Sequence, residues 1–176
     1  MVSFEGVMLR GVNITAPRVG ICAPNITLFG SQIETSGRGC PSNRGVGAGV
    51  IGGYCSGTGG AHGGEGGHGG LLTKSERTRD ICAKNIPKPY YYLEEARYEG
   101  SGGASGIRKK RAGGAGGGII WLSTTGTINL EKSTLSANGK NGTTDTFTNA
   151  RGSGGGAGGS VQLTMKGLKG DGVVSI

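Results

Sequence analysis

Residues 11–36 read GVNITAPRVGICAPNITLFGSQIETS. Apolar residues lie two apart within this stretch, and the pattern advances in steps of seven: Val12/Ile14, Val19/Ile21, Ile26/Leu28 and then Ile33. A period of two is typical of a β-strand, in which alternate side chains point to one face. Bend-forming residues separate the units, at Ala16–Pro17, Ala23–Pro24 and Gly30–Ser31. The stretch therefore predicts short strands joined by bends.

The seven-residue step also has to be compared with a helical heptad. A heptad spaces its apolar residues three or four apart, and Pro17 and Pro24 would interrupt a helix. Short strands that bend the same way instead wind into a solenoid, where each strand pairs in parallel with its neighbours one turn away. Three sides of seven residues give a turn of about 21 residues, with Val12 over Ile33. We therefore predict an all-β fold, a right-handed parallel β-helix (solenoid).

The last third of the chain repeats the pattern. The apolar pairs there are Ile120/Leu122, Ile128/Leu130, Leu135/Ala137, Val161/Leu163 and Val174/Ile176, with Leu168 between the last two. Two stretches also begin alike, GGAGGGIIWL at 113–122 and GGGAGGSVQL at 154–163, which indicates an internal repeat. We expect one β-helix unit over 1–176, with coil regions 1–36 and 119–176 and insertions at 37–118 and 138–160.

Glycine dominates the insertions. The chain holds 41 Gly in 176 residues, and Gly does not recur at every third position as collagen requires. A disordered low-complexity linker is one interpretation. The other is an ordered set of polyglycine-II-like extended helices with three residues per turn, which need backbone hydrogen bonds between neighbouring glycine strands. The regular spacing of the insertions, and their small content of Ser, Pro and Glu, favours the ordered form.

A formal net charge of +8 suits anionic partners. The most compact basic run is Arg108, Lys109, Lys110 and Arg111, which fits a solvated loop, a polyanion contact or a processing site. Nucleic acid is not expected as a partner, because repeated Arg-Gly-Gly units with interleaved aromatics are missing. The longest apolar run, residues 119–122, is too short to cross a bilayer, so no membrane span is expected.

Cysteines and asparagines give candidate modification sites. The cysteines, Cys22, Cys40, Cys55 and Cys82, have no CxxC spacing, and two disulfides formed in an oxidising compartment are favoured over free thiols. Three pairings are possible, and the sequence does not choose among them. The glycosylation sequons are at Asn13, Asn25 and Asn141. Asn13 and Asn25 flank inward apolar residues, so both are expected to point to solvent.

Catalytic and metal chemistry find little support. His62, Glu65 and His68 recur every three residues and would share one face of a three-per-turn helix, where they could bind zinc. Successive members would lie about 9 Å apart, which favours solvated spacers instead. No cofactor is expected, and the chain is not expected to be an enzyme, because the acidic residues of the strand regions are scattered. Thr124, Thr125 and Thr127 are too few for an ice-binding array.

Several motifs together resemble a known family. They are IETSGRGC (33–40), SGTGGAHGGEGGHGG (56–70), YEGSGGASG (98–106), GGAGGGIIWLSTTGTINLEKSTLSANGKNG (113–142) and GSGGGAGGSVQL (152–163). Their order resembles the large glycine-rich repeat proteins of plants, ciliates and other protists. The resemblance implies a parallel β-helix, an extracellular or cell-surface location and a structural role, with no catalytic residues. No secretion signal is visible and the strand pattern runs through Val174–Ile176, so we expect a segment of a longer protein.

These features predict a structural building block of an extracellular filament or cell-surface coat. Unpaired strand edges at both ends of a solenoid invite further pairing, so the expected partner is a second copy, bound head to tail. Contacts that do not close generate filaments. The alternative is a cationic extracellular module that binds acidic polysaccharide.

Overall fold

A computed structural model describes residues 5–51, 56–67, 86–90, 98–106, 112–143 and 152–176. Within these residues the fold is all-β, with strands and no helix. The strands are β1 (Val7–Arg10), β2 (Asn13–Thr15), β3 (Arg18–Cys22), β4 (Ile26–Phe29), β5 (Gln32–Glu34), β6 (Ile119–Ser123), β7 (Thr127–Glu131), β8 (Thr134–Ser136), β9 (Ser160–Thr164), β10 (Gly167–Gly170) and β11 (Val173–Ser175).

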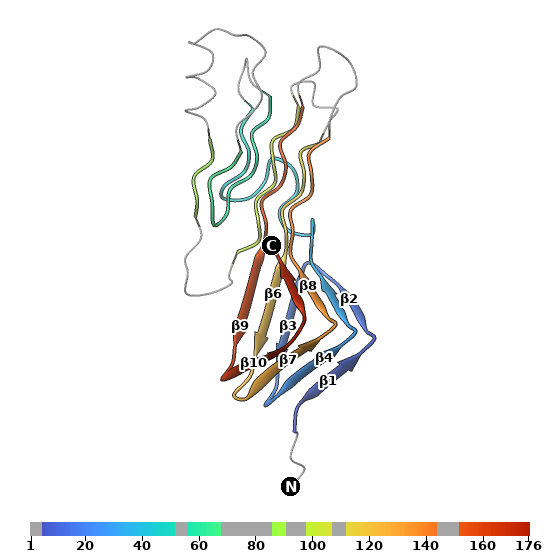
Figure 1. Cartoon of the computed structure of the whole chain (residues 1–176). Coiled ribbons are helices and arrows are strands. Elements are labelled where there is room, and N and C mark those ends of the chain that lie inside the picture. Colours follow the sequence, from blue (N-terminus) through green and yellow to red (C-terminus); the bar gives the residue numbers. More distant parts are fainter. Residues whose placement is uncertain (1–4, 52–55, 68–85, 91–97, 107–111, 144–151) are drawn as a thin grey trace.

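The strands form three parallel sheets that the chain visits in turn (Figure 1). Sheet A has the order β1-β4-β7-β10, sheet B has β2-β5-β8-β11, and sheet C has β3-β6-β9. One passage of the chain through sheets A, B and C is here called a circuit. Each strand pairs with the strand of the same sheet in the next circuit, so the backbone of every inner strand is bonded on both sides. The prediction of short parallel strands is confirmed.

The length of a circuit differs from the predicted 21 residues. Val7 lies beside Ile26 and Ile14 beside Ile33, and Val12 donates its N–H to Ser31 Oγ across a separation of 19 residues. The prediction that Val12 lies over Ile33 is therefore wrong. Gly11 (φ +61°) turns the chain between β1 and β2, which places Val12 at the corner, 37 % exposed. Ile14 takes the inward position instead.

Aliphatic side chains from all three sheets fill the interior. The buried core consists of Ile26, Leu28, Ile33, Ile120, Leu122, Ile128, Leu130 and Leu135. These residues come from β4 to β8, and each of these strands has a neighbouring strand on both sides. Inward residues of the edge strands, β1 to β3 and β9 to β11, are only partly covered, because each of these has a described neighbouring strand on one side alone. The inward side chains are thus buried in the middle of the stack of strands and partly exposed at both of its ends.

The described parts of residues 37–118 and 138–159 are here called the glycine bundle. They connect β5 to β6 and β8 to β9, and they extend away from the corner where sheet B ends and sheet C begins (Figure 1). Their backbones bond to one another with a step of three residues. Gly100 N–H donates to Gly117 O and Gly103 N–H to Gly114 O, both at 2.9 Å. Cys40 N–H donates to Gly100 O at 3.1 Å. Backbone groups that would otherwise be buried without partners are satisfied in this way.

Close backbone contact explains why these positions are glycine. A Cβ on Gly116 would lie 1.8 Å from Gly100 O, and one on Gly114 would lie 1.8 Å from Lys140 O. Residues 100–106 are all buried, although none of them carries a large side chain. The bundle is therefore held by main-chain packing, in contrast to the aliphatic interior of the sheets.

Candidate functional site

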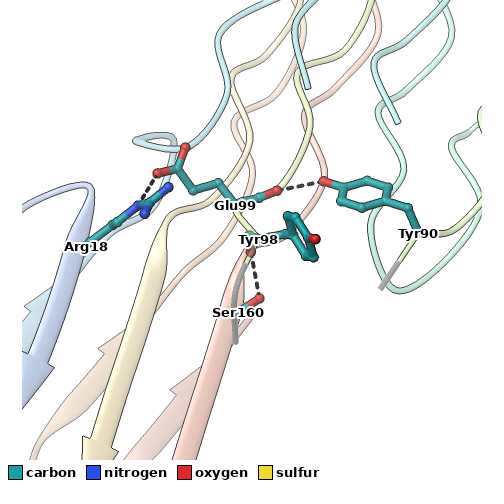
Figure 2. Close-up of polar contacts among 5 residues, drawn as sticks. All are labelled: Arg18, Tyr90, Tyr98, Glu99 and Ser160. Atoms are coloured by element: carbon teal, nitrogen blue, oxygen red, sulfur yellow. Dashed lines mark hydrogen bonds and ion pairs between the residues drawn. The ribbon is translucent and has the colours of Figure 1, made fainter. Parts of the chain in front are cut away.

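An aromatic cluster lies where the glycine bundle meets sheet C (Figure 2). It contains His62, Tyr90 and Tyr98, together with Ser160 at the start of β9. The rings of His62 and Tyr90 are 5.2 Å apart, and those of Tyr90 and Tyr98 meet edge to face at 6.1 Å. Such pairs stabilise a contact beyond the area that they bury. The cluster joins three segments that are distant in sequence.

Hydrogen bonds fix the orientation of the cluster. Tyr90 donates its hydroxyl to Glu99 O at 2.6 Å and accepts a bond from Ser101 Oγ at 2.8 Å. Ser160 Oγ donates to Tyr98 O at 2.9 Å and lies 3.5 Å from His62 Nε2. Since the Ser160 hydroxyl donates to a main-chain carbonyl, it is held as a structural group.

Burial controls the protonation of the cluster. It lowers the pKa of His62, and hydrogen bonds to the carbonyls of Gly159 and Gly158 oppose the shift. Burial also raises the pKa of Tyr90, which the bond from Ser101 partly offsets, and it raises the pKa of Cys40 nearby. At neutral pH the imidazole, the phenol and the thiol are all uncharged. Their geometry is that of a packed, neutral junction.

The residues proposed for metal binding are not brought together. His62 is buried in the junction, while Glu65 Oε1 forms an ion pair with Lys88 Nζ at 2.8 Å. His68 lies outside the described residues. Over the described ranges, no group of three His, Cys, Asp or Glu side chains gathers around a common point.

The candidate modification sites lie in different surroundings. Cys22 in β3 is an exposed free thiol, and Cys40 in the glycine bundle is a half-buried free thiol. Cys55 and Cys82 lie outside the described residues. The side chains of Asn13 and Asn141 are exposed.

Asn25 is exposed as well, but both atoms of its amide are used. Its Nδ2 donates to Glu5 O at 3.2 Å, and its Oδ1 accepts from Thr127 N at 3.0 Å. These bonds link the first, second and third circuits at one corner. The basic run Arg108, Lys109, Lys110 and Arg111 lies outside the described residues. Among the residues described, no helix is long and apolar enough to cross a membrane.

A second feature lies at β9, the last described strand of sheet C. Among the described strands, sheet C has three members, whereas sheets A and B have four. The edge of β9 is therefore set back by one strand from β10 and β11. A cavity of about 420 Å³ lies beside the start of β9, lined in part by His62, residues 157–161 and Ile176.

Sequence reasoning missed both features for a physical reason. His62 and Ser160 are 98 residues apart, and nothing local in either stretch indicates the other. No family model, curated protein or solved structure matches the chain. Any functional assignment therefore depends on the sequence and geometry of the chain itself.

Proposed function

We propose that sheets A, B and C are the three faces of a right-handed parallel β-helix. The chain enters them in a constant order and every pairing is parallel, which supports this arrangement. Crossover connections between parallel strands are right-handed in nearly all proteins, which supports the hand.

We propose further that the glycine bundle is a set of polyglycine-II-like helices. Such helices have three residues per turn and no internal hydrogen bonds. From the pair Gly100–Gly117 to the pair Gly103–Gly114 the chain moves three residues forward in one segment and three back in the other, a spacing that matches three residues per turn in two antiparallel segments.

We propose that the protein is a structural building block of an extracellular filament or cell-surface coat, and that its copies join end to end. One observation carries this proposal. Leu168 and Val174 occupy inward positions beside Ile128 and Leu135, and are 56 % and 42 % exposed, whereas Ile128 and Leu135 are completely buried. Another rung of strands would bury this apolar surface. The family resemblance supports the extracellular location.

The opposite end of the stack offers a matching surface. Among the described strands, its first members, β1 and β2, have no partner on their outer sides, and they run parallel to β10 and β11. Continuing the register of sheet A places Met8 of the next copy beside Lys169, and Arg10 beside Asp171. The second pair joins opposite charges. Because the two edges differ, the contact is head to tail and extends into a filament.

A designed disulfide tests this register. Met8 and Lys169 are both exposed on the outer face of sheet A. Neighbouring strands lie about 4.8 Å apart, within the range of Cα distances that a disulfide spans. The double variant M8C/K169C is expected to give a ladder of covalent oligomers on a non-reducing gel, and filaments by negative-stain microscopy.

The matched control is R10C/K169C, in which the cysteines are displaced by two residues along the same face. We expect it to form far fewer oligomers, as should each single-cysteine variant, which also reports on the native cysteines. Equal ladders from both double variants, or a monomeric M8C/K169C with a native circular dichroism spectrum at high protein concentration, would overturn the proposal. Antibody labelling of intact and permeabilised cells of the source organism tests the location.

A further inference from the structure

We propose that the outer face of sheet C binds a neutral polysaccharide, and that the indole of Trp121 is the platform on which one of its sugar rings stacks. The ligand is a β-linked glycan whose pyranose rings present a flat C–H face. Trp121 lies in β6, the middle strand of sheet C, between the described strands β3 and β9 (Figure 1). The site therefore lies within the body of the sheet, and it does not depend on end-to-end assembly.

The neighbouring strand makes room for the indole. Gly20 of β3 lies beside Trp121 in the parallel register. A Cβ on Gly20 would lie 3.3 Å from Cε3 and 3.9 Å from Cζ3 of Trp121, so the benzene edge of the indole occupies the space that a side chain on β3 would take. Trp121 is nevertheless 42 % exposed. The ring thus leans onto the next strand and keeps a large part of its surface open to solvent.

The other side chains of this face near Trp121 are small. The outward positions two residues further along the three strands hold Cys22, Ser123 and Thr164, all of which are exposed or half-buried. A stable interface with a protein takes about 800 Å² from each partner and has an apolar centre. One indole beside a thiol and two hydroxyls does not provide such a centre. It suits a ligand that is apolar on one face and carries hydroxyls at its rim.

A pyranose ring with equatorial hydroxyls has this character. Its axial C–H bonds carry a small positive charge, which the negative face of an aromatic ring attracts. Its hydroxyls lie at the rim, and the hydroxyls of Ser123 and Thr164 both donate and accept hydrogen bonds. Two residues of a strand span about 6.6 Å, so these groups lie within reach of the stacked sugar or of the next one in its chain. A flat face also suits a chain that lies along it, because small apolar ligands bind in concave sites.

The charges beside the platform favour a neutral sugar over an acidic one. Arg18 is the only charged residue of β3, β6 and β9. Its guanidinium is paired with the Glu99 carboxylate at 2.8 Å (Figure 2). The pair contributes no net charge to this face. The net charge of +8 belongs to the chain as a whole, and salt screens exposed charges beyond about 8 Å at physiological ionic strength.

Tryptophan fluorescence tests the proposal, because Trp121 is the only tryptophan of the chain. The probe is cellohexaose, a neutral β-1,4-linked oligomer of glucose. We expect it to shift the emission of the full chain to shorter wavelength and to protect the indole from acrylamide quenching, both saturably. Titration calorimetry gives the affinity, which Trp121→Ala should weaken at least about tenfold. Phe29→Ala is the matched control and should leave the affinity unchanged, since Phe29 is an outward aromatic residue of β4, an inner strand of sheet A.

A second variant moves the indole without removing it. Gly20→Val places a side chain where the edge of the indole lies, at a strand position where a β-branched residue is well accommodated. We expect a native circular dichroism spectrum and a severalfold weaker affinity for cellohexaose. An unchanged affinity would contradict stacking on the ring in this position.

The matching oligomer of β-1,4-linked glucuronic acid separates stacking from attraction between charges. It has the same rings and linkage with added carboxylates, and it should bind no more tightly than cellohexaose. Tighter binding of the acidic oligomer would refute the proposal, as would equal binding of cellohexaose by Trp121→Ala or no binding by the natively folded chain. An emission shift that grows with protein concentration in the absence of sugar would show that a second copy covers the ring, which also refutes it.

Discussion

Arg18 and Glu99 form an ion pair of 2.8 Å that connects β3 to the glycine bundle across 81 residues of sequence. Figure 2 shows the guanidinium of Arg18 beside the carboxylate of Glu99. The main-chain carbonyl of Glu99 also accepts a hydrogen bond from the Tyr90 hydroxyl. The Arg18 side chain is 67 % exposed and that of Glu99 is 19 % exposed. The ion pair therefore lies at the surface of the junction, whose interior is held by the hydrogen bonds of Tyr90 and Ser160.

Removal of this ion pair should have a small effect. Exposed pairs contribute about 0.2–1 kcal/mol, because water and salt screen them. A double-mutant cycle with Arg18→Gln and Glu99→Gln, measured by urea unfolding, should give a coupling free energy in this range that decreases at high salt. A salt-independent coupling above about 2 kcal/mol would show that the pair is shielded from water.

Glycine in the bundle should be required at some positions and replaceable at others. Gly116→Ala places a Cβ against Gly100 O, so the two backbones must separate. We expect destabilisation of at least about 1–3 kcal/mol, the usual range for overpacking. Gly63→Ala is the matched control, because no atom lies within 4 Å of its added Cβ. Thermal and urea unfolding should show a lower stability for the first variant only, and equal stabilities would contradict the close packing.

Truncation of the inward side chains of sheet A should destabilise the fold strongly in the middle of the sheet and weakly at its edge. Ile128 is completely buried, and Ile128→Ala should cost about 2–5 kcal/mol through the lost contacts and the cavity. Leu168 occupies the adjacent position in β10 but is mostly exposed. Leu168→Ala should therefore cost far less in the monomer, measured by urea unfolding at low concentration. The same substitution should weaken end-to-end association, which sedimentation measures.

The sequence predicted the strands more reliably than the length of a circuit. Alternating apolar residues located β3, β4 and β6–β9 because strand side chains alternate with a period of two. The corners are less regular. Gly11 and Val12 form one corner, where the Val12 amide donates to Ser31 Oγ. The sequence pattern therefore placed Val12 in the interior although it lies at the corner. Local pattern does not distinguish a corner valine from a core valine.

The junction was beyond sequence reasoning for a different reason. Its contacts depend on how glycine segments align, and a run of glycines carries no side-chain pattern that specifies its neighbour. The sequence predicted extended helices with three residues per turn, but it did not predict which segments lie side by side, as Gly100 and Gly103 lie beside Gly117 and Gly114. Tyr98 lies beside Ser160 of sheet C, although 62 residues separate the two in sequence.

Asn25 should matter to stability more than Asn13. Its side-chain amide connects Glu5 O to Thr127 N, and each such bond contributes about 0.5–1.5 kcal/mol. Asn25→Ala should therefore lower the free energy of unfolding by about 1 kcal/mol or more. Asn13→Ala, at an exposed strand position, is the control and should change it little. Equal effects of the two substitutions in urea unfolding would contradict the bridging role.

Stability should decrease with acidification through His62. Burial lowers its pKa in the folded state below the ordinary value of 6.5, so the unfolded chain binds a proton more readily. The free energy of unfolding should therefore decrease as the pH falls below about 6.5 and level off, for this residue, below the folded-state pKa. Protonation would place a charge against the Tyr90 ring and Ser160 in a poorly hydrated junction.

His62→Gln separates this effect from other titrations. The variant should be less stable at neutral pH, because the ring contact with Tyr90 is lost, but its stability should change less between pH 7 and pH 5. Urea unfolding across that range gives the slope, and proton NMR of the imidazole gives the folded-state pKa directly. The other histidine, His68, is removed in both backgrounds by His68→Gln. A folded-state pKa at or above 6.5, or equal slopes for the two chains, would show that burial of the imidazole does not control the acid sensitivity of the junction.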